Sequence, residues 1–318
     1  MNAPHRIDSL TAPLLVTWQL TRDCDLACLH CCTDSAPGKR LPDELSEAEA
    51  LDVARQIAAA GVPYVMLAGG EPMVSPHFWA VAEALGAAGV TLKIETNGQK
   101  VDRGVAERLA RLPIRSVQVS LDGDTEATYA RQRPGGTLAR AHAACEAIVA
   151  AGMPLEITFA PTRFNIHEAA AVIERACRLG AFRFNTGQLM RIGTAARHWG
   201  KVEPDAAAYA DFKAVLARAS SRGDIEVLFE PFTLEEALRS SLGEPPATLL
   251  VLPNGWVKVA AALPHICADL RQRNFAQAWD DYRRAWHGAT MATAVRGALD
   301  DAGRHAQANS WQLLSVHA

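Results

Sequence analysis

The sequence has little of what marks nucleic-acid-binding, secreted or membrane-spanning proteins. Its 32 Lys and Arg are outnumbered by 35 Asp and Glu, and no basic stripe stands apart from the acidic residues. Residues 1–13 mix polar and small side chains and lack the apolar core of a signal peptide. No uninterrupted apolar run reaches the ~18 residues that a membrane helix needs. We therefore expect a cytoplasmic protein with no nucleic-acid partner and no membrane partner.

Cysteine is scarce outside one short segment. The chain has seven cysteines, and four of them fall within nine positions: Cys24, Cys28, Cys31 and Cys32. The other three stand alone in the sequence: Cys145, Cys177 and Cys267. An odd, clustered set in a chain without a secretion signal argues against a disulfide framework and favours metal or redox chemistry.

From residue 14 to about residue 200, short apolar runs alternate with amphipathic segments. Such alternation, with helices of ~10–15 residues, is typical of parallel βα units joined by right-handed crossovers. The predicted strands are 14–20, 63–68, 91–95, 116–121, 155–160 and 181–186. The fold class that follows is α/β, a partial (βα)6 TIM-like barrel over residues 14–200 with an apolar interior. In such barrels the functional groups gather at the C-terminal ends of the strands.

The pattern changes after residue 200. Two apolar runs flank the turn sequence Pro253–Asn254–Gly255, which predicts a hairpin, and residues 275–286 read as an amphipathic helix. We expect a small α+β C-terminal cap over residues 201–290. Residues 291–318, rich in alanine and polar side chains, are expected to form a loosely packed tail.

The segment Cys24-x3-Cys28-x2-Cys31 directly follows the first predicted strand. Three thiolates can ligate three irons of a cubane cluster and leave the fourth iron to an external chelate. A structural zinc site needs a fourth protein ligand, which His30 or Cys32 would supply, so the spacing alone leaves zinc open. The cluster is favoured because Gly69–Gly70–Glu71–Pro72 follows the second strand, where glycines let the backbone approach a ligand.

These motifs, taken in order, resemble those of the radical S-adenosylmethionine (SAM) superfamily. They are CDLACLHC at Cys24–Cys31, GGEP at 69–72, ETNG at 95–98 and SLDG at 120–123. The chain is most similar to the branch that carries a SPASM or twitch extension at its C-terminus. The resemblance implies an enzyme whose reduced cluster cleaves SAM to a 5′-deoxyadenosyl radical, which removes hydrogen from a substrate.

The resemblance also assigns roles to individual residues. It implies one [4Fe–4S] cluster, with Cys24, Cys28 and Cys31 as its ligands, and an electron donor such as flavodoxin or ferredoxin. Arg131 fits the family pattern for a partner of the SAM carboxylate better than Arg133 does. The full set of implied SAM contacts is Gly69, Gly70, Glu71, Thr96, Asn97, Ser120, Asp122, Arg131 and Leu189.

The C-terminal extension departs from the family pattern. Residues 249–259 and 267–279 resemble a SPASM or twitch region, but Cys267 is the single cysteine after residue 200. Residues 201–290 are therefore expected to be a degenerate extension without an auxiliary cluster. Without that second electron acceptor, redox-neutral outcomes are favoured: elimination, epimerisation, decarboxylation or rearrangement. Cys267 is a candidate for returning a hydrogen atom to the substrate.

The substrate is expected to be an intermediate of specialised metabolism or a peptide-derived molecule. The first strand begins near Leu14, which indicates no leader-peptide-binding domain before the barrel. One alternative is a maturase that crosslinks or oxidises a peptide presented by a partner protein. Another is a non-catalytic zinc- or cluster-binding protein without affinity for SAM. A third, in which SAM donates a methyl or aminocarboxypropyl group, lacks a clear cobalamin site or extra reactive cysteines.

Overall fold

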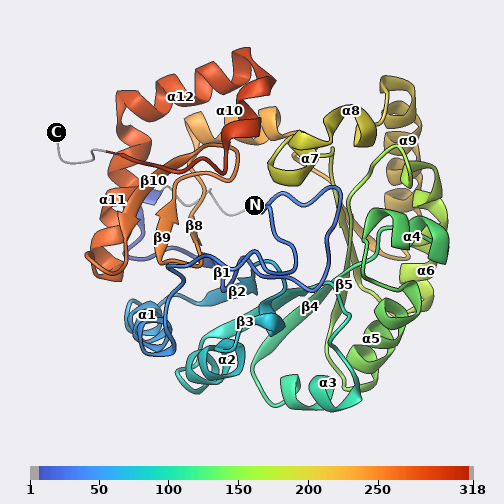
Figure 1. Cartoon of the computed structure of the whole chain (residues 1–318), viewed down its shortest axis with the longest axis horizontal. Helices are drawn as coiled ribbons and strands as arrows, with labels where there is room; N and C mark the ends of the chain where they lie inside the picture. Colours follow the sequence, from blue (N-terminus) through green and yellow to red (C-terminus); the bar gives the residue numbers. More distant parts are fainter. Residues whose placement is uncertain (1–6, 315–318) are drawn as a thin grey trace.

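The computed structural model describes residues 7–314, and its strands form one curved sheet (Figure 1). Strands β1 to β7 are parallel and lie in chain order, and β8 pairs in parallel with β1 on the opposite side. The sheet stays open, because β7 and β11 form its two edges. The strands are β1 Leu15–Gln19, β2 Tyr64–Ala68, β3 Thr91–Thr96, β4 Ile114–Ser120, β5 Leu155–Phe159, β6 Arg183–Thr186, β7 Glu226–Leu228, β8 Thr248–Val251, β9 Trp256–Lys258, β10 His265–Asp269 and β11 Gln312–Leu313.

Helices α1 to α6 cover the outer face of the parallel strands (Figure 1). The first of them begins after Ser46, where the sequence signature Ser-x-x-Glu predicts a helix start: Ser46 and Glu49 form a reciprocal capping box. The α-helices are α1 Glu47–Ala59, α2 Phe78–Ala87, α3 Arg103–Leu109, α4 Glu126–Gln132, α5 Leu138–Ala150, α6 Ala169–Arg178, α7 Gly193–Arg197, α8 Trp199–Val202, α9 Ala206–Arg222, α10 Leu234–Gly243, α11 Phe275–His287 and α12 Ala289–Asp300. Short 3₁₀ segments are η1 Ile7–Ser9, η2 Pro72–Val74, η3 Ile166–Glu168 and η4 Ala302–Gln307.

The alternation of side chains along each strand separates an apolar outer layer from a polar barrel interior. In β3, Leu92 and Ile94 are fully buried in the hydrophobic core, whereas Lys93 and Glu95 lie on the other face of the strand. Lys93 Nζ lies 2.8 Å from Glu156 Oε2 of β5, within the barrel. The expectation of an apolar interior is therefore wrong, since these polar groups of β3 and β5 satisfy one another across the inner face of β4.

The C-terminal region extends the barrel sheet instead of forming a separate cap. Strand β8 pairs with β1 from Leu15↔Thr248 to Trp18↔Val251, and the predicted hairpin is confirmed as antiparallel β8 and β9. A seventh parallel strand, β7, pairs with β6 and continues the barrel past residue 200. The predicted partial barrel is thus confirmed, and residues 201–290 add strands to its open sheet on both sides.

The expectation of a loose tail from residue 291 is wrong for the residues that the structure describes, while residues 315–318 lie outside them. Met291, Val295 and Ala298 of α12 are buried at helical spacing, so they form one apolar stripe that packs on α10 and α11. Further along, Asn309 Nδ2 donates a hydrogen bond to the carbonyl oxygen of Cys32 at 2.8 Å. The segment therefore belongs to the core and also holds the cysteine-containing loop.

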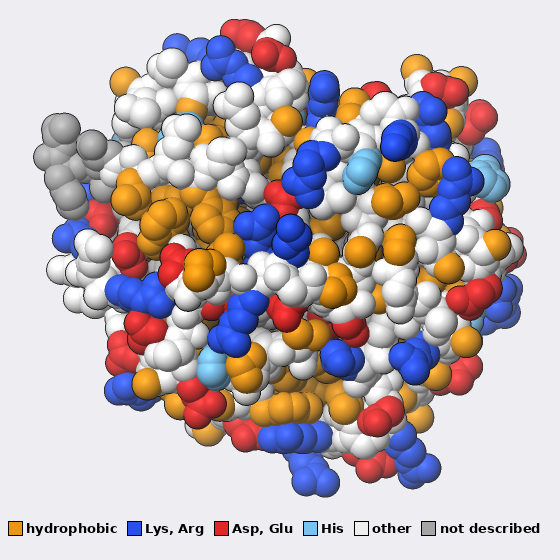
Figure 2. Space-filling model, viewed as in Figure 1, with side chains coloured by type: hydrophobic (Ala, Val, Ile, Leu, Met, Phe, Trp, Pro, Cys, Tyr) orange, Lys and Arg blue, Asp and Glu red, His pale blue; other side chains and the backbone are white. Residues whose placement is uncertain are grey.

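On the face shown in Figure 2, hydrophobic side chains gather over strands β8 to β10, and charged side chains of both signs are mixed over the rest. Within residues 7–314, no helix combines the length and the apolar character needed to cross a membrane.

The packing of α12 yields a stability prediction. Met291→Ala removes a side chain that is 1% exposed, and we expect the free energy of unfolding to fall by about 2–5 kcal/mol. Thr293→Ala, on the exposed side of the same helix, should change it by less than about 0.5 kcal/mol. Urea unfolding of both variants measures the difference. Equal, negligible effects would mean that the helix contributes nothing to the core.

Candidate active site

The C-terminal ends of the parallel strands surround a cavity of about 540 Å³. Its walls are the loop of residues 24–35 (the cluster loop), the ends of β1 to β6, and residues 231–237 that follow β7. Nine of the residues predicted from the sequence line it together: Cys24, Cys28, Cys31, Gly69, Gly70, Thr96, Asn97, Ser120 and Leu189.

Each of the three predicted cluster thiols is free and receives a hydrogen bond. Leu26 N lies 3.4 Å from Cys24 Sγ, Ser35 N lies 3.3 Å from Cys31 Sγ, and Arg133 Nη1 lies 3.6 Å from Cys28 Sγ. Burial is the main cause that raises the pKa of Cys24 and of Cys28 to about 12, so both are neutral thiols without a metal. Donors aimed at sulfur stabilise thiolates once irons bind, and this donor set fits a cubane cluster.

A mononuclear zinc site fits the same residues less well. Among residues 7–314, no group of three or more Cys, His, Asp or Glu side chains is placed to hold a metal ion. Zinc requires ligands that converge on one point, whereas a cubane takes one thiolate at each corner. One of the two candidates for a fourth ligand is also committed elsewhere, because His30 Nε2 lies 3.0 Å from Asp122 Oδ2.

The glycine-rich turn after β2 lies directly against the backbone of residues 21–23, which lead into the cluster loop. Gly70 N donates to Thr21 O at 2.7 Å, and a Cβ added at Gly70 would stand 2.0 Å from Asp23 O. Gly69 has φ +149°, and its Cβ would stand 2.6 Å from Thr21 O. Only glycine permits this approach, which leaves backbone exposed to the cavity beside the thiols.

Glu71 lies behind the cavity wall rather than in it. It is fully buried and accepts hydrogen bonds from Thr96 Oγ1 at 2.9 Å and Asn97 N at 2.8 Å. Burial raises the pKa of Glu71 to about 7, against the opposing effect of these donors. Its carboxylate therefore positions the turn after β3, and Asn97 in turn donates from Nδ2 to Asp25 Oδ1 of the cluster loop at 2.7 Å.

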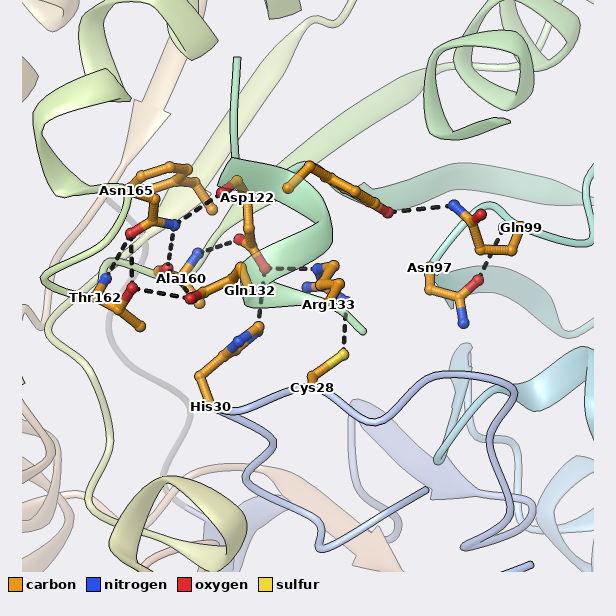
Figure 3. A network of polar contacts seen from close by, with 12 residues as sticks. Cys28, His30, Asn97, Gln99, Asp122, Gln132, Arg133, Ala160, Thr162 and Asn165 are labelled. Atoms are coloured by element: carbon orange, nitrogen blue, oxygen red, sulfur yellow. Dashed lines mark hydrogen bonds and ion pairs between the residues drawn. The ribbon is translucent and has the colours of Figure 1, made fainter. Parts of the chain in front are cut away.

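Asp122 is the centre of a buried polar network (Figure 3). Its Oδ2 lies 2.6 Å from Arg133 Nε and 3.0 Å from His30 Nε2, and its Oδ1 accepts from Ala160 N at 2.7 Å. Burial alone would raise the pKa of Asp122, but the Arg133 guanidinium and then His30 outweigh it and lower the pKa to about 2. The ionised carboxylate thus joins the cluster loop to the ends of β4, α4 and β5.

The structure places Arg133, not Arg131, at the cavity. The Arg131 side chain is exposed and lies 3.8 Å above the ring of Phe164. Arg133 is 7% exposed, lines the cavity and contacts both Asp122 and Cys28. The reason is α4, a helix that the sequence pattern did not reveal: it ends at Gln132, so Arg133 is its C-cap and turns inward.

Other cavity residues escaped the sequence analysis, and one candidate does not reach the cavity. Glu95 and Gln118 form the cavity floor, and Phe232 belongs to the wall after β7. Alternation along β3 was the available signal, because it places Glu95 on the same face as Lys93. Cys267 is 3% exposed, does not line the cavity and donates from Sγ to Val257 O at 3.4 Å, so a hydrogen-returning role has no structural support.

Comparison with known proteins agrees with this geometry. The model of the radical SAM superfamily matches residues 18–176, and the chain belongs to that superfamily. It is therefore a radical SAM enzyme, a class that carries a [4Fe–4S] cluster and SAM.

Three curated relatives illustrate the match. The mycofactocin maturase MftC of Mycobacterium ulcerans (strain Agy99) is 38% identical over 199 residues, 62% of this chain and 53% of the relative. The PqqA peptide cyclase of Ruegeria pomeroyi is 30% identical over 300 residues, 91% of this chain and 78% of the relative. The AdoMet-dependent heme synthase of Methanosarcina barkeri is 25% identical over 294 residues, which cover 85% of this chain and 83% of the relative. The chain spans about half the length of the mycofactocin maturases that it matches.

Solved structures show the same fold at low sequence identity. Streptococcus suis SuiB bound to S-adenosylmethionine superposes with a TM-score of 0.68 at 14% identity, over 90% of this chain and 68% of that chain. SuiB bound to the precursor peptide SuiA gives a TM-score of 0.69 at 15% identity, over 91% of this chain and 68% of that chain.

The two arginines make a matched test of the site. Arg133→Met leaves Asp122 buried without its main cation, so we expect a loss of about 3–5 kcal/mol in the free energy of unfolding. SAM affinity should fall about tenfold or more. Arg131→Met removes an exposed cation–π contact and should cost no more than about 1 kcal/mol. Urea unfolding and equilibrium dialysis with SAM measure both effects, and equal losses in the two variants would contradict the assignment.

Proposed function

We propose that this enzyme holds one [4Fe–4S] cluster on Cys24, Cys28 and Cys31, binds SAM beside it, and modifies a peptide. The observation that carries the proposal is the cavity of about 540 Å³ into which all three thiols open. Pockets for drug-sized ligands measure ~300–1,000 Å³, and SAM is itself a ligand of that size. SAM therefore occupies most of the cavity, and the substrate enters only with the part that reacts.

When bound and reduced, the cluster supplies an electron that breaks a carbon–sulfur bond of SAM and yields a 5′-deoxyadenosyl radical. An external reductant such as flavodoxin or ferredoxin would deliver that electron. The residues of this chain bind and orient SAM. The open backbone at Gly69 and Gly70 suits its amino group, Arg133 suits its carboxylate, and Leu189 offers an apolar wall for its adenine. Enclosure by these walls keeps water from the radical.

A peptide suits the shape of the remaining space. The part of the cavity wall that follows β6 and β7 carries four apolar side chains: Met190, Pro231, Phe232 and Leu234. A side chain that projects from a larger molecule can therefore enter beside SAM along this wall. Several relatives bear names that point the same way: a mycofactocin maturase, a sporulation killing factor maturation protein and a PqqA peptide cyclase. These relatives support the peptide alternative better than the small-molecule substrate expected first.

A second candidate is a tetrapyrrole carboxylate, because the AdoMet-dependent heme synthase matches over 85% of this chain. The cavity argues for the peptide. Arg133 is the one Lys or Arg among its described lining residues, and we assign it to the SAM carboxylate, so the carboxylates of a tetrapyrrole find no further Lys or Arg there. Within this chain, Cys267 is the single cysteine after residue 200, so we propose no auxiliary cluster and a redox-neutral outcome.

The direct test is anaerobic reconstitution with iron and sulfide, followed by reduction, addition of SAM and assay of 5′-deoxyadenosine by liquid chromatography. Wild type should form it, and Cys28→Ala should not. Cys177→Ala, a half-buried thiol on α6 remote from the cavity lining, serves as the matched control and should match wild type. No product, together with unbound SAM and one tightly held zinc, would overturn the proposal.

A further inference from the structure

The cavity floor is built from side chains that alternate into the barrel from neighbouring strands. Glu95 of β3, Gln118 of β4 and Asn185 of β6 line it side by side. Asn185 Nδ2 lies 3.3 Å from Gln118 Oε1, and Gln118 Nε2 lies 3.0 Å from Glu95 Oε1. The floor is therefore an ordered row of polar groups that ends in a carboxylate.

Charge pairing in this part of the barrel leaves Glu95 without a cation. The neighbouring carboxylate of Glu156 takes Lys93 at 2.8 Å and Arg183 at 3.6 Å. Arg133, the other cation near the floor, is paired with Asp122. Among the residues from 7 to 314, Glu95 forms no ion pair.

The second oxygen of Glu95 is open to the cavity. Oε1 accepts from Gln118, whereas Oε2 accepts no hydrogen bond from residues 7–314, and the side chain lines the cavity. Burial raises the pKa of Glu95, against the opposing effects of Lys93, Arg133 and Gln118. Thr158 Oγ1, also on the cavity wall, has no partner either. A desolvated carboxylate without an ion-pair partner costs free energy that a directly bound cation would recover.

We propose that Glu95 binds a positively charged group of the substrate, the ammonium or guanidinium of a lysine or arginine side chain of the peptide. This inference rests on the proposed function, because it places the substrate side chain in the cavity that also holds SAM. A long aliphatic stem suits the apolar wall of Met190, Phe232 and Leu234, and the charge at its end suits the carboxylate on the floor. Glu95 is thus the residue that selects a basic side chain.

SAM offers a different cation, its sulfonium, so the experiment must separate the two. The probes are Nα-acetyl-L-lysine amide and Nα-acetyl-L-norleucine amide, which differ chiefly in the terminal charge. Both are titrated by saturation-transfer NMR into the holoenzyme with SAM and an oxidised cluster, so that no SAM is cleaved. The proteins are wild type, Glu95→Gln, Glu95→Asp and the control Glu107→Gln, whose carboxylate on α3 is exposed and paired with Arg103.

The lysine probe should bind wild type and Glu107→Gln equally, and bind Glu95→Gln about tenfold more weakly or worse. Glu95→Asp keeps the carboxylate but shortens the side chain by one methylene group. Its affinity for the lysine probe should therefore lie between that of wild type and that of Glu95→Gln. Iron content and circular dichroism establish that each variant is loaded and folded. The norleucine probe should bind all four proteins alike.

Three results would overturn the inference. The first is equal binding of the two probes to wild type, and the second is undiminished binding of the lysine probe to Glu95→Gln. The third is a loss of SAM affinity in Glu95→Gln that equals its loss of affinity for the lysine probe. The last result would assign Glu95 to the sulfonium. The binding experiment requires no turnover. A failure to form 5′-deoxyadenosine would therefore overturn the proposed function, while the measured affinities of the two probes could still be interpreted.

Discussion

The ionised carboxylate of Asp122 is the interaction on which the site depends. It is fully buried and collects donors from three separate parts of the chain: His30, Arg133 and the amide of Ala160 (Figure 3). Removing it would leave the Arg133 cation buried without its partner, which is costly in a poorly solvated interior. Because Arg133 also reaches Cys28 Sγ, the same carboxylate sets where a positive charge stands beside a cluster thiolate. The cluster loop is therefore tied to the ends of β4 and β5 through this one carboxylate.

The two faces of the parallel strands have different roles, one in the hydrophobic core and one in the site. The outer face supplies apolar side chains to the core under the helices, and the inner face supplies the polar floor that ends at Glu95. The C-terminal region serves both purposes, since β8 extends the sheet beside β1 and Asn309 holds the cluster loop through the carbonyl of Cys32. The part of the chain after residue 200 thus contributes structure to the site.

The sequence predicts those features that local pattern decides. Strand positions, the capping box at Ser46 and the three cluster cysteines follow from periodicity, cap chemistry and spacing. The role of Arg133 depends on where α4 ends, and the burial of α12 depends on tertiary contacts with α10 and α11. The polar interior depends on the order and register of the strands, which bring Lys93 of β3 to Glu156 of β5 across the inner face of β4. None of these can be derived from composition or from motif order alone.

Hydrogen exchange of the metal-free protein tests the central claim most directly. Amides of the cluster loop are bonded to the segment that carries Arg133, with Ala27 N 3.0 Å from Pro134 O and Leu29 N 3.2 Å from Gln132 O. Asp122→Asn should raise exchange of residues 26–32 roughly tenfold or more. The control Asp124→Asn, whose carboxylate pairs with Arg175, should leave these amides unchanged. Unchanged protection in Asp122→Asn would contradict the account.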